Sequence, residues 1–386
     1  MDQPVFDDLE QTLTAKGPAA AIDQLCERLR AEKDYTGLFY AMLMRKRHEL
    51  GVSPIPTAPT QDLPVSAHEP FEEAIRAAAR LVGGLFLEEG NLPQAWVYFR
   101  MIGEPQPVAE ALERHRPAEG EDVQQLVQIA FYEGVQPRKG FDLILSRFGI
   151  CNAITTMGTQ MELPHPPDVR TYCIRRLVHA LYDELRERLA ADTQRHEGKA
   201  PTATSVRELM AGRDYLFADE FAHVDTSHLG AVVQMSIHLP PGEELDLARE
   251  LCAYGQRIAP RLQYPGDPPF EDQYRDYGVY LATLAGDRTE EGVAHFRAKA
   301  EGADPETVGT YPAEVLVNLL LRLDRPAEAL ALARRHLARV DNRRLTCPGI
   351  SELCQKANDY GTLAEVAREQ GDPVHFVAGL IASGAR

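Results

Sequence analysis

Two histidines and one aspartate lie close together in the stretch FAHVDTSHLG (221–230): His223, Asp225 and His228. Imidazole nitrogens and a carboxylate together form a ligand set that suits a divalent transition metal such as zinc, iron or manganese. The two histidines do not have the i, i+4 spacing that places both on one helical face. We therefore predict that they can share a metal only where the chain turns between them.

The same stretch has a second interpretation that needs no metal. Asp225, Thr226 and Ser227 are all residue types that cap helix N-termini, so a helix is expected to begin here. Asp225 or Ser227 would then cap this helix. His228 would pack at the helix start, and His223 would lie on the surface. Short His/Asp clusters without a fixed family spacing are weak motifs, so the sequence favours the helix start.

A second group of candidate residues lies in QYPGDPPFEDQYRDYGVYL (263–281). Asp267 followed by Pro268 is typical of an N-cap and a first helical position, which predicts that a helix begins there. Glu271 would fall in the first turn, where the helix dipole favours anions. One interpretation is ordinary helix initiation. In the other, Tyr264 and Glu271 project into the same groove as the histidines, with Glu271 as metal ligand or general base.

A third group flanks the turn in FYEGVQPRKGF (131–141), which contains Tyr132, Glu133, Arg138 and Lys139. Loops on a rigid scaffold often carry binding groups, so Glu133 is a candidate catalytic residue, with a solvated turn as the alternative. The sequence contains no phosphate-binding glycine loop and no G-x-S-x-G elbow. The sequence therefore offers no motif for a nucleotide-binding site or a serine-hydrolase site.

The composition limits the partners and the compartment. The chain of 386 residues carries 58 acidic and 41 basic side chains, and its net charge is −17. Such a surface repels nucleic-acid backbones and anionic lipid headgroups, so we expect neither nucleic acid nor a membrane as partner. The six cysteines are scattered without a C-x-x-C pair, and no signal peptide is recognisable. These features predict a cytoplasmic protein.

Helical periodicity divides the chain into five segments. N-terminal helices are predicted over 1–50. The proline-rich stretch 51–70 is a linker or surface crossing. A helical pair follows over 71–119, and a divergent helical central region with the candidate histidines covers 120–270. Helical pairs return over 271–386.

The pattern of small and large side chains over residues 77–107 is typical of two helices that pack as a pair. The stretch reads AAARLVGGLFLEEGNLPQAWVYFRMIGEPQP. Gly83 and Ala95 would let the helices approach closely, and Gly90 would end the first helix. Large apolar positions are filled by Phe86, Leu92 and Phe99. The stretch resembles a tetratricopeptide (TPR) repeat. In one weaker copy near the C-terminus, Gly292 and Phe296 occupy the corresponding small and large positions. Another copy repeats the scheme with Ala329 and Ala333.

The resemblance implies an all-α fold, a TPR-like solenoid of antiparallel helix pairs around a non-repeat central region. It also implies a concave groove that binds a peptide, a protein or a small-molecule ligand. The groove-facing positions of that family correspond here to Arg80, Gly84 and Glu88, with Leu87 beside them. The alternative function is a metal-dependent hydrolase or lyase, in which a metal-bound water is the nucleophile or base. Its ligands would be the two histidines with Asp225 or Glu271.

Overall fold

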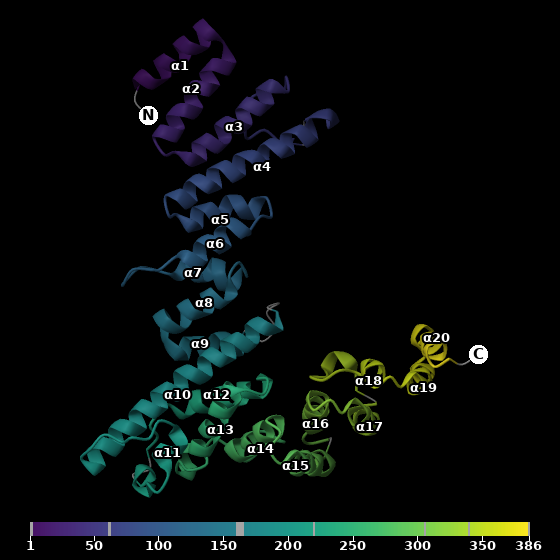
Figure 1. Ribbon diagram of the computed structural model, residues 1–386. Helices are drawn as coiled ribbons and strands as arrows, with labels where there is room; N and C mark the ends of the chain where they lie inside the picture. The colour runs from purple at the N-terminus through teal and green to yellow at the C-terminus, as the bar shows by residue number, and fades with distance from the viewer. Residues whose placement is uncertain are drawn as a thin grey trace. The chain divides into compact units, whose positions relative to one another are not determined.

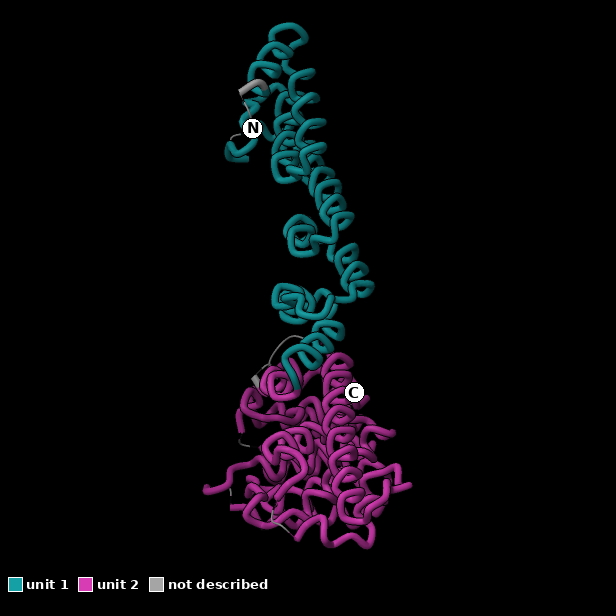
Figure 2. The backbone as a smooth tube through the Cα atoms, turned by 90° about the vertical axis from the view of Figure 1, so that its left-hand side faces the viewer, with its two compact units in different colours: residues 1–149 teal, residues 150–386 magenta. Residues whose placement is uncertain are grey.

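The computed structural model describes residues 3–60, 63–159, 166–218, 221–304, 306–338 and 340–384. These residues form helices joined by turns, with no β-strand among them, so the all-α prediction is confirmed. The chain divides into two compact units, residues 1–149 and 150–386, which Figure 2 shows in different colours. No helix in the described ranges is long and apolar enough to cross a membrane.

Unit 1 consists of helices that follow one another in chain order (Figure 1). Two π-helical turns, Gln128–Tyr132 and Ile144–Phe148, flank its last helix. The α-helices are α1 (Gln3–Lys16), α2 (Pro18–Ala31), α3 (Tyr35–Glu49), α4 (Val65–Glu88), α5 (Leu92–Met101), α6 (Gln106–Arg114), α7 (Gln124–Val127) and α8 (Pro137–Leu143).

An aromatic cluster joins α3, α4 and α5 in the core of unit 1. The ring of Phe86 meets the ring of Tyr35 edge to face at 5.1 Å, and it stacks on the ring of Tyr98 at 5.7 Å. Such pairs add to the stabilisation from apolar burial. Each helix from α1 to α5 packs against the next helix along the chain. One buried apolar cluster therefore extends from α2 to α5.

The proline-rich segment after α3 is held in place by the buried side chain of Arg47. Its guanidinium donates hydrogen bonds to the carbonyl oxygens of Ser53 and Ala58, at 2.7 and 3.3 Å, and it lies over the ring of Phe71. A buried cation needs such partners, because it has lost its hydration. Helix α4 begins at Val65, so the last part of segment 51–70 is helical.

Unit 2 contains the long helix α10 and a series of shorter helices (Figure 1). Helix α9 (Gly149–Thr159) begins at the boundary between the units. The other helices are α10 (Pro167–Glu197), α11 (Val206–Met210), α12 (Thr226–Met235), α13 (Glu243–Gly255), α14 (Gln273–Leu284), α15 (Thr289–Gly302), α16 (Tyr311–Arg322), α17 (Pro326–His336), α18 (Ile350–Lys356), α19 (Tyr360–Gln370) and α20 (Pro373–Ala382).

Helix α10 presents one apolar stripe to the core of unit 2. This stripe includes Cys173, Leu177, Leu181 and Leu185, which are all buried. Helix α10 packs against α11, α12 and α13. From α12 to α20 each helix packs against the next, and α14 also contacts α12 and α16. The packing is therefore mostly between neighbours in sequence.

One three-residue turn recurs in both units, between α2 and α3, α4 and α5, α16 and α17, and α18 and α19. The helix C-cap is followed by a residue in the left-handed conformation and then by the N-cap of the next helix. The left-handed residues are Lys33, Gly90, Asp324 and Asn358. In each turn the N-cap backbone N–H donates to a carbonyl of the preceding helix, as Asn91 does to Phe86 at 2.9 Å. The turn thereby satisfies a carbonyl that the helix leaves unpaired.

Candidate functional site

His223 is buried in unit 2, with only 4% of its surface exposed, so the prediction that it lies on the surface is wrong. The Tyr254 hydroxyl on α13 accepts a hydrogen bond from the His223 backbone N–H at 2.7 Å and lies 3.1 Å from Nδ1. Asp192 Oδ2 on α10 lies 3.4 Å from Nε2. Burial lowers the pKa of His223 from its ordinary value, while Asp192 acts in the opposite direction. Burial also raises the pKa of Tyr254 to about 12, so its hydroxyl stays protonated.

Asp225 is the N-cap of α12, as the helix-start interpretation predicts. Its carboxylate accepts hydrogen bonds from the backbone N–H groups of Ser227 and His228, at 2.8 and 3.4 Å. Within the described residues, no group of three or more His, Cys, Asp and Glu side chains is placed to hold a metal ion. The structure therefore does not bring His223, Asp225 and His228 together as the predicted ligand set.

Helix α14 begins at Gln273 with Asp272 at the N-cap position, so the predicted start at Pro268 is wrong. A residue that precedes a proline is disfavoured in the α conformation, and Pro268 precedes Pro269. This restriction moves the helix start beyond the prolines. The apolar stripe of this region is nevertheless buried. Its buried members are Phe270, Tyr274, Tyr277, Leu281 and Leu284.

The two candidate residues before α14 do not join the histidines. Glu271 lies outside the helix and forms an ion pair with Lys299 on α15. Tyr264 is 57% exposed in the loop that precedes α14. No hydrogen bond or ion pair among the described residues connects either side chain to His223 or His228. Glu271 is therefore paired with the Lys299 ammonium and not with the histidines.

Glu133 connects two helical segments of unit 1. Its Oε2 accepts hydrogen bonds from Trp96 Nε1 at 2.7 Å and from Arg100 Nη1 at 2.9 Å, both on α5. Glu133 itself follows the π-helical turn Gln128–Tyr132. The Glu133 carboxylate therefore holds α5 against that turn.

The predicted groove residues of α4 lie at its exposed face. Arg80 forms a bidentate ion pair with Glu104. The Glu104 carboxylate accepts hydrogen bonds from Arg80 Nε and Nη2 at 2.7 to 3.1 Å. Leu87 is half-buried and Glu88 is exposed. An added side-chain carbon at Gly84 would meet open space, so this face of α4 is accessible.

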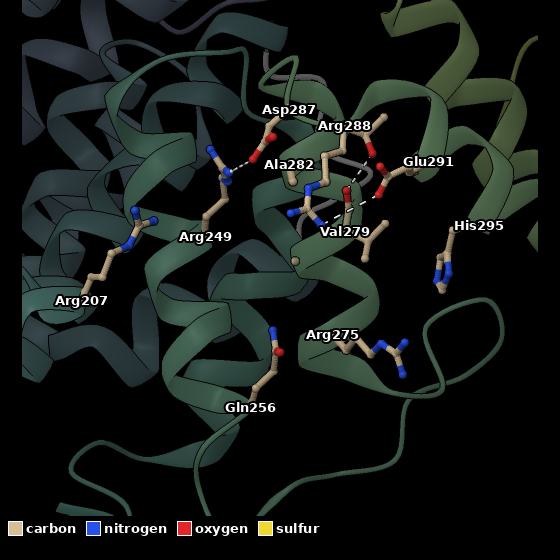
Figure 3. A pocket seen from close by; sticks show the side chains of 13 residues that line it. Arg207, Arg249, Gln256, Arg275, Val279, Ala282, Asp287, Arg288, Glu291 and His295 are labelled. Carbon is tan, nitrogen blue, oxygen red and sulfur yellow. Dashed lines mark hydrogen bonds and ion pairs between the residues drawn. The ribbon is translucent and has the colours of Figure 1, made fainter. Parts of the chain in front are cut away.

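A pocket of about 500 Å³ opens in unit 2 over one face of α14 (Figure 3). Its walls come from α11, α13, the α14–α15 turn and α15. Small residues of α14 and α15 also line it, among them Gly278, Ala282 and Gly292. The polar residues that line it are Arg207, Arg249, Gln256, Arg275, Thr283, Asp287, Arg288, Glu291 and His295.

The pocket reverses the charge balance of the chain. Four arginines line it against two carboxylates, whereas acidic residues outnumber basic ones 58 to 41 in the whole sequence. Arginine guanidinium groups bind carboxylates and phosphates through paired hydrogen bonds. The pocket is therefore suited chemically to an anionic ligand.

The four arginines differ in how far the protein already neutralises them. Arg249 is held by Asp287 at 2.8 Å and by Asp246 at 3.0 Å. Arg288 lies 3.9 Å from Glu291, and Arg207 lies 4.0 Å from Glu250, which are weak contacts. Arg275 forms no hydrogen bond or ion pair with another described residue. Arg275 is therefore the guanidinium most available to a ligand.

One histidine at the pocket is fixed by a buried carboxylate. His295 Nε2 on α15 lies 2.8 Å from Oδ1 of Asp276 on α14. Asp276 is only 1% exposed, and its Oδ2 accepts from Lys299 Nζ at 2.8 Å. Figure 3 shows the His295 ring and the Arg275 side chain toward the same side of the pocket.

Comparison with models of protein families, with curated proteins and with solved structures finds no match to this chain.

Sequence reasoning missed the pocket because its residues come from separate elements. The arginines are supplied by α11, α13, α14 and the α14–α15 turn, so no short motif contains them. One signal was present in α14. Arg275, Gly278, Val279 and Ala282 share the helical face opposite the apolar stripe, and a face with small residues beside an arginine leaves room for a ligand.

Proposed function

We propose that this chain is a TPR-like helical-repeat protein that binds an acidic segment of a peptide or protein in the arginine-lined pocket of unit 2. The observation that carries the proposal is the excess of arginine over carboxylate around this pocket in an acidic chain. Asp246 and Glu250 lie outside the lining and pair with Arg249 and Arg207, so the charge left for a ligand is above all that of Arg275. Carboxylates beyond about 8 Å do not cancel it, because salt screens them at physiological ionic strength.

Four observations support the TPR-like solenoid. Neighbouring helices pack in chain order, and four helix pairs share one turn geometry. The left-handed turn residues Asp324 and Asn358 are separated by the period of about 34 residues that the TPR family has. An added side-chain carbon at Gly83 would lie 2.7 Å from the Phe99 ring, and one at Gly292 would lie 1.7 Å from Thr283 Oγ1. Small residues thus stand where paired helices approach, as the resemblance implies.

The placement of the arginines favours a ligand with several separated anionic groups. Figure 3 shows Arg207 and Arg275 on opposite sides of the pocket, with Arg249 and Arg288 between them. A single phosphate ion would meet only some of these groups. An acidic peptide carries carboxylates along its length, so it can engage guanidinium groups from several helices together.

The test is titration calorimetry of the full chain with an acetylated and amidated hexaglutamate peptide at low salt. The substitution Arg275→Gln removes the guanidinium that has no partner among the described residues. Loss of one charge-assisted contact is expected to weaken binding about tenfold or more. Arg343→Gln is the matched control, because it removes the same charge from an exposed site outside the pocket. It should change the dissociation constant less than about twofold.

Two further titrations separate peptide binding from general anion binding. Inorganic phosphate should bind much more weakly than hexaglutamate, and raising the salt concentration should weaken peptide binding. The proposal is overturned if hexaglutamate does not bind, or if Arg275→Gln and Arg343→Gln weaken binding equally.

A further inference from the structure

The imidazole of His295 is held at the pocket in one orientation. Its Nε2 faces Asp276 at 2.8 Å, and 29% of the His295 side-chain surface is exposed. Its other ring nitrogen, Nδ1, has no hydrogen-bond partner among the described residues. The ring therefore has one nitrogen used by the protein and one that is free to meet a ligand.

The carboxylate that orients His295 cannot easily turn away. Asp276 accepts hydrogen bonds from Lys299 Nζ at 2.8 Å and from the Asp272 backbone N–H at 3.0 Å, both through Oδ2. Its Oδ1 is left for His295, and the whole residue is buried. A carboxylate anchored in this way keeps a hydrogen on Nε2 and leaves the lone pair of the neutral ring on Nδ1.

We propose that His295 is the proton-linked contact of the pocket: it takes up one proton when an acidic ligand binds. This inference rests on the proposed function. In the neutral ring, Nδ1 presents a lone pair to the ligand, which repels a carboxylate oxygen. Addition of a proton at Nδ1 turns that atom into a donor and gives the ring a positive charge, so ligand binding and protonation favour each other.

The charged groups around His295 are compatible with this exchange. The carboxylates near His295 are Asp276 on α14, Glu271 before α14 and Glu291 on α15. The cations near it are Lys299 on α15 and Arg275 on α14. No hydrogen bond or ion pair among the described residues connects His295 to α16, which also packs against α15. A bound carboxylate adds negative charge on the pocket side, which shifts this balance toward the imidazolium.

The experiment measures hexaglutamate binding by calorimetry between pH 6.0 and 8.0, in buffers with different ionisation enthalpies. This range lies above the ordinary pKa of glutamate side chains, so the peptide keeps its charge. The wild-type protein should bind about tenfold more weakly at pH 8.0 than at pH 6.0, because one charge-assisted contact is lost. Near pH 7 the buffer dependence of the heat should show net proton uptake.

Two variants complete the test. His295→Gln keeps an amide donor for Asp276 but does not titrate, so its affinity should vary less than about twofold across the range and its proton uptake should vanish. His375→Gln is the control, because His375 also pairs with an aspartate, Asp372 at 2.6 Å, but on α20 and outside the pocket. It should bind as the wild type does.

The outcomes distinguish the two proposals. Absence of hexaglutamate binding at every pH overturns the proposed function itself. Binding without pH dependence, without proton uptake, or with the same pH dependence in His295→Gln overturns the role of His295 alone. Absence of proton uptake by the wild-type chain overturns the role of His295 even if the His295→Gln variant does not fold.

Discussion

The Nδ1 atom of His223 lies 3.1 Å from the hydroxyl oxygen of Tyr254, and the same oxygen accepts the His223 backbone N–H at 2.7 Å. Because the oxygen accepts from the backbone, its own hydrogen is free to point at Nδ1. The arrangement therefore suits a neutral ring that accepts at Nδ1 and carries its hydrogen on Nε2, toward Asp192. A protonated ring would carry a hydrogen on Nδ1 as well, so the hydroxyl oxygen would have to accept two hydrogen bonds and turn its own hydrogen away.

This arrangement predicts acid sensitivity in the region around His223. Burial lowers the pKa of His223 in the folded state, so the unfolded chain binds the proton more readily. The stabilisation is complete above the ordinary histidine pKa of about 6.5 and is lost as the pH falls toward the lowered folded value. One group can contribute at most about 1.4 kcal/mol per pH unit.

The measurement is hydrogen exchange of the α12 and α13 amides as a function of pH, corrected for the intrinsic exchange rate. His223→Asn retains an acceptor for Tyr254 but has no titrating ring, so its protection should fall less below pH 6.5 than that of the wild type. An equal loss of protection in both proteins would show that another group is responsible.

Two adjacent glycines of α4 should respond to the same substitution with opposite signs. An alanine at Gly83 would place its Cβ 2.7 Å from the Phe99 ring on α5, whereas one at Gly84 would meet nothing within 4 Å. We expect Gly83→Ala to destabilise unit 1 by about 1–3 kcal/mol through overpacking. Gly84→Ala should stabilise it by up to about 1 kcal/mol, because alanine is the better helix former.

Urea unfolding followed by the fluorescence of Trp96 measures both variants, since the single tryptophan of the chain lies in unit 1. Equal effects of the two substitutions would mean that the close approach of α4 and α5 at Gly83 does not limit stability.

The sequence predicts helices and their buried faces well where one helix supplies the whole pattern. The α10 stripe and the apolar side of α14 are examples, because side chains at i, i+3 and i+4 share a face regardless of the neighbouring helices. Gly83 was also identified, since a glycine inside a helix indicates a close approach.

Features that depend on several elements were not predictable in this way. His223 is buried because Tyr254 and Asp192, each 31 residues away, provide its partners. The sequence indicates the recurring turn only at Gly90. Lys33 and Asp324 take the same left-handed conformation without being glycine, because the helix–turn–helix hydrogen bonds impose it. The arginine pocket, likewise, exists only once α11, α13, α14 and α15 have packed.

Glu133 is expected to matter for stability through Trp96. Removal of its carboxylate leaves the indole N–H, in a residue only 9% exposed, without its acceptor at 2.7 Å. We expect Glu133→Ala to lower the free energy of unfolding of unit 1 by about 1–3 kcal/mol. Arg100→Gln removes only the ion pair of an exposed arginine and should have an effect of less than about 1 kcal/mol.

Both variants can be followed by the fluorescence of Trp96 during urea unfolding. Similar losses in Glu133→Ala and Arg100→Gln would contradict the importance of the indole hydrogen bond and assign the effect to the ion pair.

Asp287 should compete with an acidic ligand for Arg249. Its carboxylate lines the pocket and lies 2.8 Å from the Arg249 guanidinium, so a ligand carboxylate must share or displace that contact. We expect Asp287→Asn to tighten hexaglutamate binding about two- to fivefold, the range that an exposed ion pair of up to about 1 kcal/mol allows. Asp246→Asn removes the other partner of Arg249, which lies outside the pocket, with the same change of charge. Because this control leaves the competing carboxylate in place, it should improve binding less. Weaker binding by Asp287→Asn would show instead that Asp287 holds Arg249 in its binding position.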